Sequence, residues 1–231
     1  MFREILNALA HGSTIDNAFS ELGEMLEHGV WMFERANEVL HSKVPAQAVS
    51  ESIYERDRAI NELERSIRRK VLRYLTVNPG YDVPVCLALM SVAKDAERIG
   101  DYCKNVFEVG QFYNEDFTEA RYRQALDQIA EETVVIFKLV SAACRDSDEG
   151  PASEAIEKAK SIRGRCDEII MGLFRDEEQI QVHEAVAYSL LARHYKRVVA
   201  HLANISTALL GQFEDLDFYN DNDIAGKPKA S

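Results

Sequence analysis

Apolar residues recur at helical spacing along almost the whole chain, and this periodicity is rarely interrupted. Residues that favour turns are scarce, with 11 Gly and 5 Pro among 231 residues, and few turns imply long helices. The pattern breaks near 43–45, 78–80, 114, 146–151 and 176. It therefore predicts an all-α protein whose six helices span about 14–42, 46–76, 83–113, 116–146, 151–175 and 180–215.

Composition limits the partners and the location. Asp and Glu outnumber Lys and Arg by 39 to 27, which gives a formal net charge of −12. General nucleic-acid binders depend on Lys and Arg to replace the counterions around phosphates, so we expect no nucleic-acid partner. No stretch approaches the ~20 apolar residues that span a bilayer. The N-terminus lacks the features of a signal peptide, and we expect a soluble, cytoplasmic protein.

The cysteines and the known catalytic motifs give no sign of an enzyme. Cys86, Cys103, Cys144 and Cys166 lie far apart without metal-binding spacing, which favours reduced, mostly buried thiols. The motifs GxSxG, GxxxxGK[ST] and HExxH are absent from the sequence. A di-iron carboxylate centre needs Glu-x-x-His on two helices, and no such pair occurs. We expect no catalytic residues.

Residues 1–12 form a short amphipathic segment ahead of the first long helix. Phe2, Ile5 and Leu6 recur at helical spacing, so we expect a short helix whose apolar side chains face the body of the protein or a neighbouring chain. A membrane contact is less well supported, because Arg3 is the only cation among the first ten residues.

An internal repeat divides the chain into two related units. The segment ERIGDYCKNV, from Glu97, aligns with KRVVAHLANI, from Lys196. In the same register, DRAINELE from Asp57 aligns with RGRCDEII from Arg163. A period of about 100 residues indicates paired three-helix units, because solenoid repeats run ~20–50 residues. The predicted organisation is a first bundle at 13–114, a second bundle at 115–217 and a loose tail at 218–231.

A row of acidic and amide side chains marks the third predicted helix. Glu97 and Asp101 are four residues apart, so their carboxylates share a helical face and repel each other unless a cation lies between them. Asp57 and Asn61 repeat this spacing on the second helix, which neighbours the third in a three-helix bundle. Oxygen ligands on facing helices can hold a metal ion. A solvated acidic face is the alternative interpretation.

These features resemble the PhoU family of phosphate-uptake regulators. The resemblance rests on ERIGDYCKNV after LALMSVAKDA, on the upstream INELE and on the duplicated three-helix unit, and it covers about residues 14–215. It implies two pseudo-repeated antiparallel three-helix bundles. It also implies a non-catalytic adaptor between the components of a phosphate transporter and a phosphate-sensing histidine kinase, associated with the membrane through these partners. A homodimer is compatible with it.

The same resemblance implies metal sites formed by carboxylate motifs, one set in each repeat. The matching positions of the first repeat are Asp57, Asn61, Glu97 and Asp101. They would hold a divalent or iron-type ion weakly, since Asn61 brings no charge. In the second repeat Lys196, Ala200 and Arg163 replace three of the four positions and leave Asp167 alone. We therefore expect any metal site to be confined to the first repeat.

The altered second repeat also carries two histidines. His194 and His201 are two helical turns apart and share a face near Arg197. Such a pair is commonly part-buried and polar, but together with Lys196 and Arg197 it could form a cationic patch suited to an acidic partner or to phosphate.

Two other classes of function remain open from the sequence. A metal-storage or metal-dependent hydrolytic protein would use the same acids, and its turnover would depend on Glu97. A structural helical interaction module would bind neither metal nor any protein connected with phosphate.

Overall fold

The computed structural model describes residues 13–80, 82–113, 115–146, 148–175 and 180–212. Within these ranges it contains no strand, and its helices are α2 (Ser13–Leu40), α3 (Ala46–Val77), α4 (Val83–Phe112), α5 (Ala120–Asp146), α6 (Glu149–Arg175) and α7 (Val182–Leu209). The predicted all-α fold is confirmed. The predicted amphipathic segment at residues 1–12 and the tail at 218–231 lie outside the described residues.

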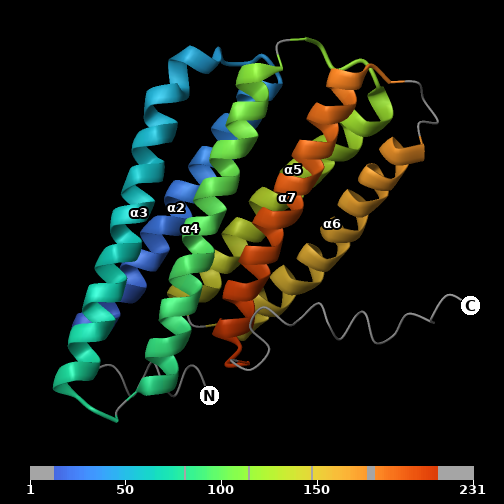
Figure 1. The fold of residues 1–231 in the computed structure, drawn as a ribbon. Helices are drawn as coiled ribbons and strands as arrows, with labels where there is room; N and C mark the ends of the chain where they lie inside the picture. Colours follow the sequence, from blue (N-terminus) through green and yellow to red (C-terminus); the bar gives the residue numbers. More distant parts are fainter. Residues whose placement is uncertain (1–12, 81, 114, 147, 176–179, 213–231) are drawn as a thin grey trace, which may run out of the picture.

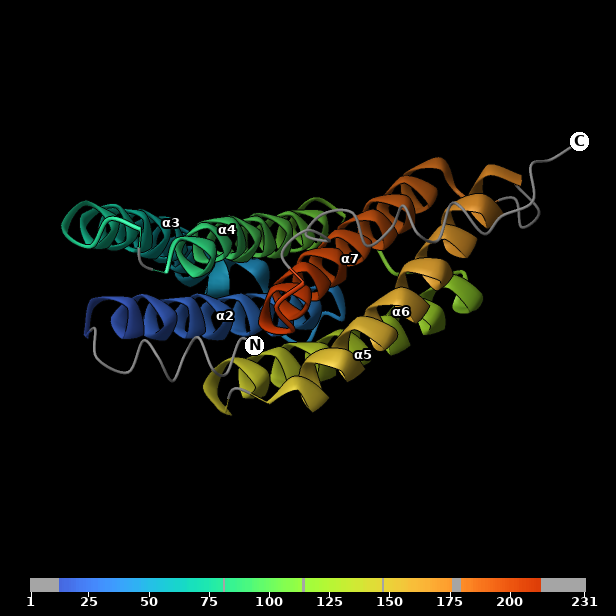
Figure 2. The ribbon, with the colours of Figure 1, turned by 90° about the horizontal axis from the view of Figure 1, so that it is seen from below.

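The helices form two groups of three that pack side by side. Figure 1 shows α2, α3 and α4 on one side of the molecule and α5, α6 and α7 on the other. Within each group every helix contacts the other two, and the groups meet chiefly where α4 packs on α7 and α2 packs on α5. Seen from below in Figure 2, α7 lies beside both α4 and α6. The exact extents of two separate repeats remain a prediction.

Aromatic side chains join the two groups in a shared core. Phe33 of α2 lies 5.2 Å from the ring of Tyr195 in α7 and 6.0 Å from that of Phe137 in α5. All three rings are buried, and the Tyr195 hydroxyl donates a hydrogen bond to Asn37. A buried hydroxyl needs such a partner, and this hydrogen bond links α7 of one group to α2 of the other.

The cysteines lie in or beside the core as free thiols. Cys86, Cys103 and Cys166 are buried, and Cys144 is partly exposed. Burial raises the pKa of the Cys86 thiol to about 11, so this sulfur is a poor nucleophile at neutral pH. This arrangement agrees with the expectation that the cysteines are reduced and mostly buried.

The last helix ends at Leu209, whereas the sequence predicted an end near 215. Gly211 has a φ of 75°, and its N–H donates to the Ala208 carbonyl at 2.9 Å. The N–H of Gln212 reaches back to the Thr207 carbonyl at 3.2 Å. These two bonds form a Schellman ending, which favours Gly because of the positive φ. The prediction went too far because apolar residues continue past this glycine.

The start of α5 is set by a carboxylate from α7. Glu184 is only 2% exposed, and its Oε1 accepts hydrogen bonds from the N–H groups of Thr118 at 2.5 Å and Glu119 at 3.0 Å. Its Oε2 accepts the Thr118 hydroxyl at 2.7 Å. Burial raises the pKa of Glu184, but these hydrogen bonds outweigh it and hold the pKa below its usual value. The helix therefore begins at Ala120 and not near 116.

A glycine allows α4 to approach α3 closely. A Cβ at Gly100 would lie 2.8 Å from Cδ1 of Ile60 on α3, which is closer than van der Waals contact permits. Gly100 stands between Glu97 and Asp101 in the sequence. The close approach therefore lies at the same level of the bundle as the predicted acidic site.

Gly100→Ala is expected to lower the free energy of unfolding by about 1 kcal/mol, because overpacking costs ~1–3 kcal/mol and the gain in helix propensity is only about 1 kcal/mol. The matched control is Gly23→Ala in α2, where nothing lies within 4 Å of the added Cβ; it should raise the free energy of unfolding by about 0.5–1 kcal/mol. Urea unfolding followed by circular dichroism measures both. Equal stabilisation by the two variants would contradict the close contact.

Glu184→Gln should lower the free energy of unfolding by about 2 kcal/mol at pH 7, because hydrogen bonds to a charged group contribute ~1.5–3 kcal/mol. The folded-state pKa of Glu184 is depressed, so its contribution is present above the unfolded pKa and is lost as the pH falls through the folded pKa. The difference in the free energy of unfolding between wild type and variant should therefore become smaller in acid. The control is Glu168→Gln, at an exposed position of α6. A difference independent of pH would refute this role.

Candidate functional site

The predicted acidic residues lie where α3 packs against α4. Asp57 and Asn61 belong to α3, and Glu97 and Asp101 belong to α4. All four side chains are part-buried. The two helices contact each other along this seam, as expected for neighbours in a three-helix bundle.

A lysine ammonium lies between the two aspartates. Nζ of Lys104 is 2.8 Å from Oδ1 of Asp57 and 3.2 Å from Oδ1 of Asp101, and the lysine side chain is 21% exposed. Burial lowers the pKa of Lys104, but the hydrogen bonds and charges of Asp57 and Asp101 outweigh it and raise the pKa above its ordinary value. The lysine therefore remains charged and neutralises the repulsion between the two carboxylates.

Glu97 belongs to a neighbouring group of ion pairs. Its Oε2 lies 2.6 Å from Nζ of Lys94, and Lys94 is 4.0 Å from the buried Glu64, which also binds Arg68 at 2.7 Å. The two groups are linked through Arg98, which is 3.9 Å from Glu97 and 3.5 Å from Asp101. Glu97 and Asp101 of α4 are thus both paired with cations.

Asn61 is held by its own helix. Its amide nitrogen donates to the backbone carbonyl of Asp57 at 3.0 Å, which is the i−4 contact that an Asn side chain can make within a helix. This hydrogen bond restrains the amide group.

The described arrangement does not form a metal-binding shell. No group of three His, Cys, Asp or Glu side chains suited to a metal ion occurs within the described residues. The structure brings Asp57 and Asp101 together, whereas Glu97 pairs with Lys94 and Asn61 binds backbone. A divalent ion between the aspartates would be repelled by the ammonium of Lys104 and would have to displace it. Metal binding by these four residues remains a prediction, and this geometry does not fit it.

The second repeat also pairs a lysine with an aspartate across two helices. Nζ of Lys196 on α7 lies 2.5 Å from Oδ1 of Asp167 on α6. In both repeats, therefore, a lysine of the last helix forms an ion pair with an aspartate of the middle helix. The two lysines are not at equivalent positions of the repeat, because Lys196 aligns with Glu97 and not with Lys104.

A buried contact between the repeats was missed from the sequence. Asp95 of α4 is buried, and its Oδ1 lies 2.7 Å from Nδ1 of His201 and 3.0 Å from Nδ2 of Asn204, both on α7. The ring of Tyr102 stacks on His201 at 5.7 Å. Asp95 could have been noticed, because it lies on the apolar side of its helix, where a charge needs a partner.

The predicted cationic patch is only partly assembled. His201 binds Asp95, and Lys196 binds Asp167, so neither is available to an outside anion. Burial, followed by the charge of Arg193, lowers the pKa of His194, which favours its neutral form. Arg197 is exposed as expected, and the neighbouring cation is Arg193, which the sequence analysis did not select.

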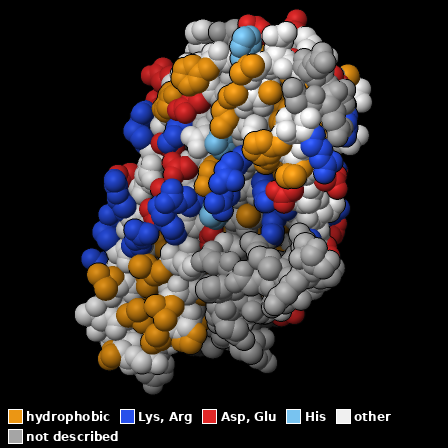
Figure 3. Space-filling model, turned by 45° about the vertical axis from the view of Figure 1, so that its right-hand side comes forward, with side chains coloured by type: hydrophobic (Ala, Val, Ile, Leu, Met, Phe, Trp, Pro, Cys, Tyr) orange, Lys and Arg blue, Asp and Glu red, His pale blue; other side chains and the backbone are white. Residues whose placement is uncertain are grey.

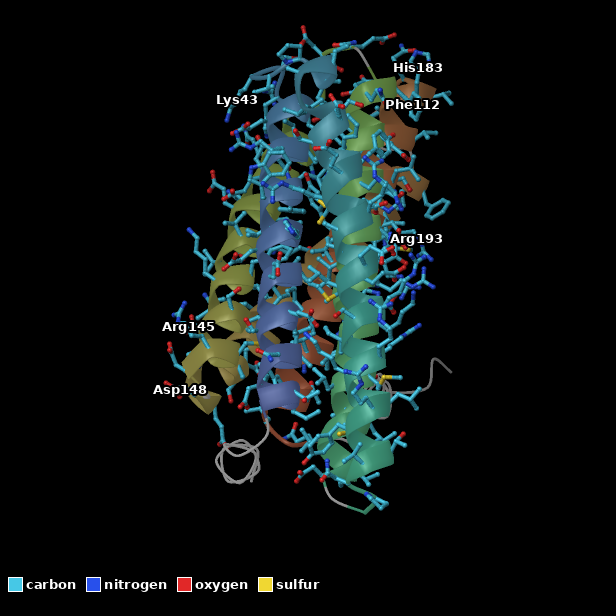
Figure 4. The ribbon with its side chains drawn as sticks, turned by 90° about the vertical axis from the view of Figure 1, so that its left-hand side faces the viewer. Lys43, Phe112, Arg145, Asp148, His183 and Arg193 are labelled. Atoms are coloured by element: carbon cyan, nitrogen blue, oxygen red, sulfur yellow. The ribbon has the colours of Figure 1, made fainter. Side chains whose placement is uncertain are left out.

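An apolar cavity of about 580 Å³ lies between the end of α4 and the start of α7. Phe112 and Val182 on its rim are 77% and 76% exposed. Figure 3 shows hydrophobic side chains gathered at the upper end of this face, and Figure 4 places Phe112 and His183 at the same end. The sequence signal was a row of apolar residues spaced by four at the start of α7, Val182, Val186 and Leu190.

None of the helices in the described part of the chain has the length and apolar character needed to cross a membrane.

Comparison with known proteins connects this geometry to a family. Residues 22–109 match the family model of the PhoU domain. Among solved structures, PhoU from Pseudomonas aeruginosa is similar with a TM-score of 0.76 and 18% identity, over 87% of this chain and 98% of that one. The phosphate transport system regulatory protein PhoU from Streptococcus pneumoniae is similar with a TM-score of 0.66 and 22% identity, over 88% and 96%. No curated protein matches the chain.

The structural likeness extends over most of the chain, whereas the family match is confined to residues 22–109. The two solved structures, at these identities, show that the six-helix fold is shared. The family match covers much of the first group of helices and includes Asp57, Glu97, Asp101 and Lys104. The predicted resemblance to the PhoU family is thus confirmed, by the match of residues 22–109 to the PhoU domain and by the fold shared with PhoU structures.

Proposed function

We propose that this protein is a non-catalytic, cytoplasmic regulator of phosphate uptake and phosphate signalling. It acts as an adaptor between the components of a phosphate transporter and a phosphate-sensing histidine kinase. The support is the PhoU domain at residues 22–109 and the fold shared with PhoU structures, one of which is described as a regulatory protein of a phosphate transport system. Association with the membrane is then indirect, through the partners.

The observation that carries the adaptor role is the exposed apolar surface around the cavity of α4 and α7. When a partner covers large apolar side chains such as Phe112 and Val182, the removal of their surface from water makes the free energy of binding more favourable. A contiguous exposed apolar patch of this kind is typical of a site where another protein binds. The cavity provides a recess into which an apolar residue of a partner can insert.

The rival functions have less support. A metal-storage or metal-dependent hydrolytic protein would use Asp57, Glu97 and Asp101, but these acids are paired with Lys104 and Lys94. A purely structural module would explain the helices but not the match to the PhoU domain.

The double variant Phe112→Glu/Val182→Glu should reduce co-purification of the transporter components and the sensor kinase at least tenfold, because it introduces charge into the apolar surface. The matched control is Leu72→Glu/Val77→Glu, which changes two apolar residues of α3 that are exposed to a similar extent. Quantitative mass spectrometry on full-length protein from phosphate-replete and phosphate-starved cells measures both. Absence of both partners from the wild-type sample, or phosphatase turnover that depends on Glu97, would reject the adaptor role.

Metal binding at the first repeat is a separate proposal, in which Lys104 is the competitor of the metal ion. Lys104→Ala should bind Mn²⁺ at least tenfold more tightly than wild type, because it removes an ammonium that lies between Asp57 and Asp101. Isothermal titration calorimetry measures the affinity. The variants Asp101→Ala and Lys104→Ala/Asp101→Ala should abolish uptake, and Lys196→Ala should leave it unchanged. No gain of affinity in Lys104→Ala would show that these acids do not form a metal site.

A further inference from the structure

The outer face of α7 carries two exposed arginines that have no ion pair with a carboxylate of the described residues. Arg193 and Arg197 are four residues apart on the helix, so their side chains lie on one face. Like charges at this spacing repel each other. An anionic group that covered both guanidinium groups would remove this repulsion.

A third arginine, on α4, lies at the same level. The contact between Asp95 and His201 sets the antiparallel register of α4 and α7 and places the turn of Arg98 beside the turn of Arg197. Arg98 is exposed and approaches Asp101 no closer than 3.5 Å. Figure 3 shows Lys and Arg side chains gathered in a band across the middle of this face. The band is a local exception on a chain whose net charge is −12.

The cationic band adjoins the apolar cavity. Along α7 the exposed row changes from Val182, Val186 and Leu190 to Arg193 and Arg197 at successive helical turns. Figure 4 shows Arg193 on the same edge of the molecule as Phe112 and His183, further from that end. The face therefore suits a segment that is both acidic and apolar.

The chain itself contains such a segment directly after the described residues. Residues 213–224, FEDLDFYNDNDI, contain five acidic residues and no basic residue. They also contain five large apolar or aromatic residues, Phe213, Leu216, Phe218, Tyr219 and Ile224. The composition is complementary to the band in charge and to the cavity in apolar character.

The segment is long enough to reach this face. Arg197 and Arg193 precede the end of α7 at Leu209 by roughly 18 and 24 Å, at 1.5 Å per helical residue. An extended chain covers ~3.3 Å per residue, so residues 213–224 can span about 40 Å. Leu190 precedes Leu209 by only about 29 Å, so residues 213–224 are long enough to pass both arginines and place Ile224 at the level of Leu190.

We propose that residues 213–224 bind back along the outer face of α7, with their carboxylates against Arg193 and Arg197 and with Ile224 at the near end of the apolar cavity. The occupant of this face in the free protein is thus the acidic segment of the same chain. A partner that docks at the cavity must displace its end. The contact itself does not depend on the adaptor role, because it is intramolecular.

The test is photo-crosslinking within the full-length protein, with p-benzoylphenylalanine at position 218. Mass spectrometry should find intramolecular crosslinks to α7 and α4 around Arg197. Their yield should fall severalfold in 1 M NaCl, where the screening length drops to about 3 Å. Arg193→Glu/Arg197→Glu should lower the yield at least fivefold.

The matched control is Arg69→Glu/Arg73→Glu, which makes the same charge change at the same spacing on two exposed arginines of α3; it should leave the yield unchanged. Adding Asp217→Lys and Asp221→Lys to Arg193→Glu/Arg197→Glu should restore the crosslinks. Circular dichroism checks that every variant is folded. Crosslinks to other helices, a yield unaffected by Arg193→Glu/Arg197→Glu, or crosslinks between two copies of the chain would each overturn the proposal.

Discussion

Burial of α4 is the constraint on which both halves of the molecule depend. This helix contacts α2 and α3 in its own group and α7 in the other, so little of its surface is left for solvent. Polar side chains on such a helix must find partners within the protein, because an unpaired buried charge is costly. Three acidic side chains of α4 are paired in this way: Asp95 with His201, Asp101 with Lys104, and Glu97 with Lys94. The acidic motif is therefore part of the packing of α4.

Local regularities of the sequence predicted the helices well. The predicted span 46–76 became Ala46–Val77, and 83–113 became Val83–Phe112, because apolar periodicity and Pro or Gly at the breaks are local signals. The start of α5 could not be predicted in this way, since it depends on Glu184, which is far away in the sequence. The pairing of Asp95 with His201 is also long-range, and only the position of Asp95 on an apolar face indicated it.

The candidate site shows the same division between local and long-range information. The spacing of Glu97 and Asp101 predicted that a cation would relieve their repulsion, and the resemblance suggested a metal ion. In the structure Glu97 is paired with Lys94, and Asp101 is paired with Lys104, which lies about one turn beyond it. The role of Lys104 depends on Asp57, which comes from another helix, so helical spacing on α4 alone did not reveal it. The outward face of α4 and α7 differs from this neutralised seam, since no described residue covers its exposed apolar side chains or pairs with Arg193 and Arg197.

We propose that this protein, whose residues 22–109 match the PhoU domain, regulates phosphate uptake through its surface and without catalysis by its acids. Uptake of radioactive phosphate by cells lacking the protein, and by the same cells supplied with variants, is the direct test of this proposal. We expect deregulated uptake without the protein, full restoration by Glu97→Gln, and little restoration by Phe112→Glu/Val182→Glu. Unchanged phosphate uptake in cells that lack the protein would contradict it.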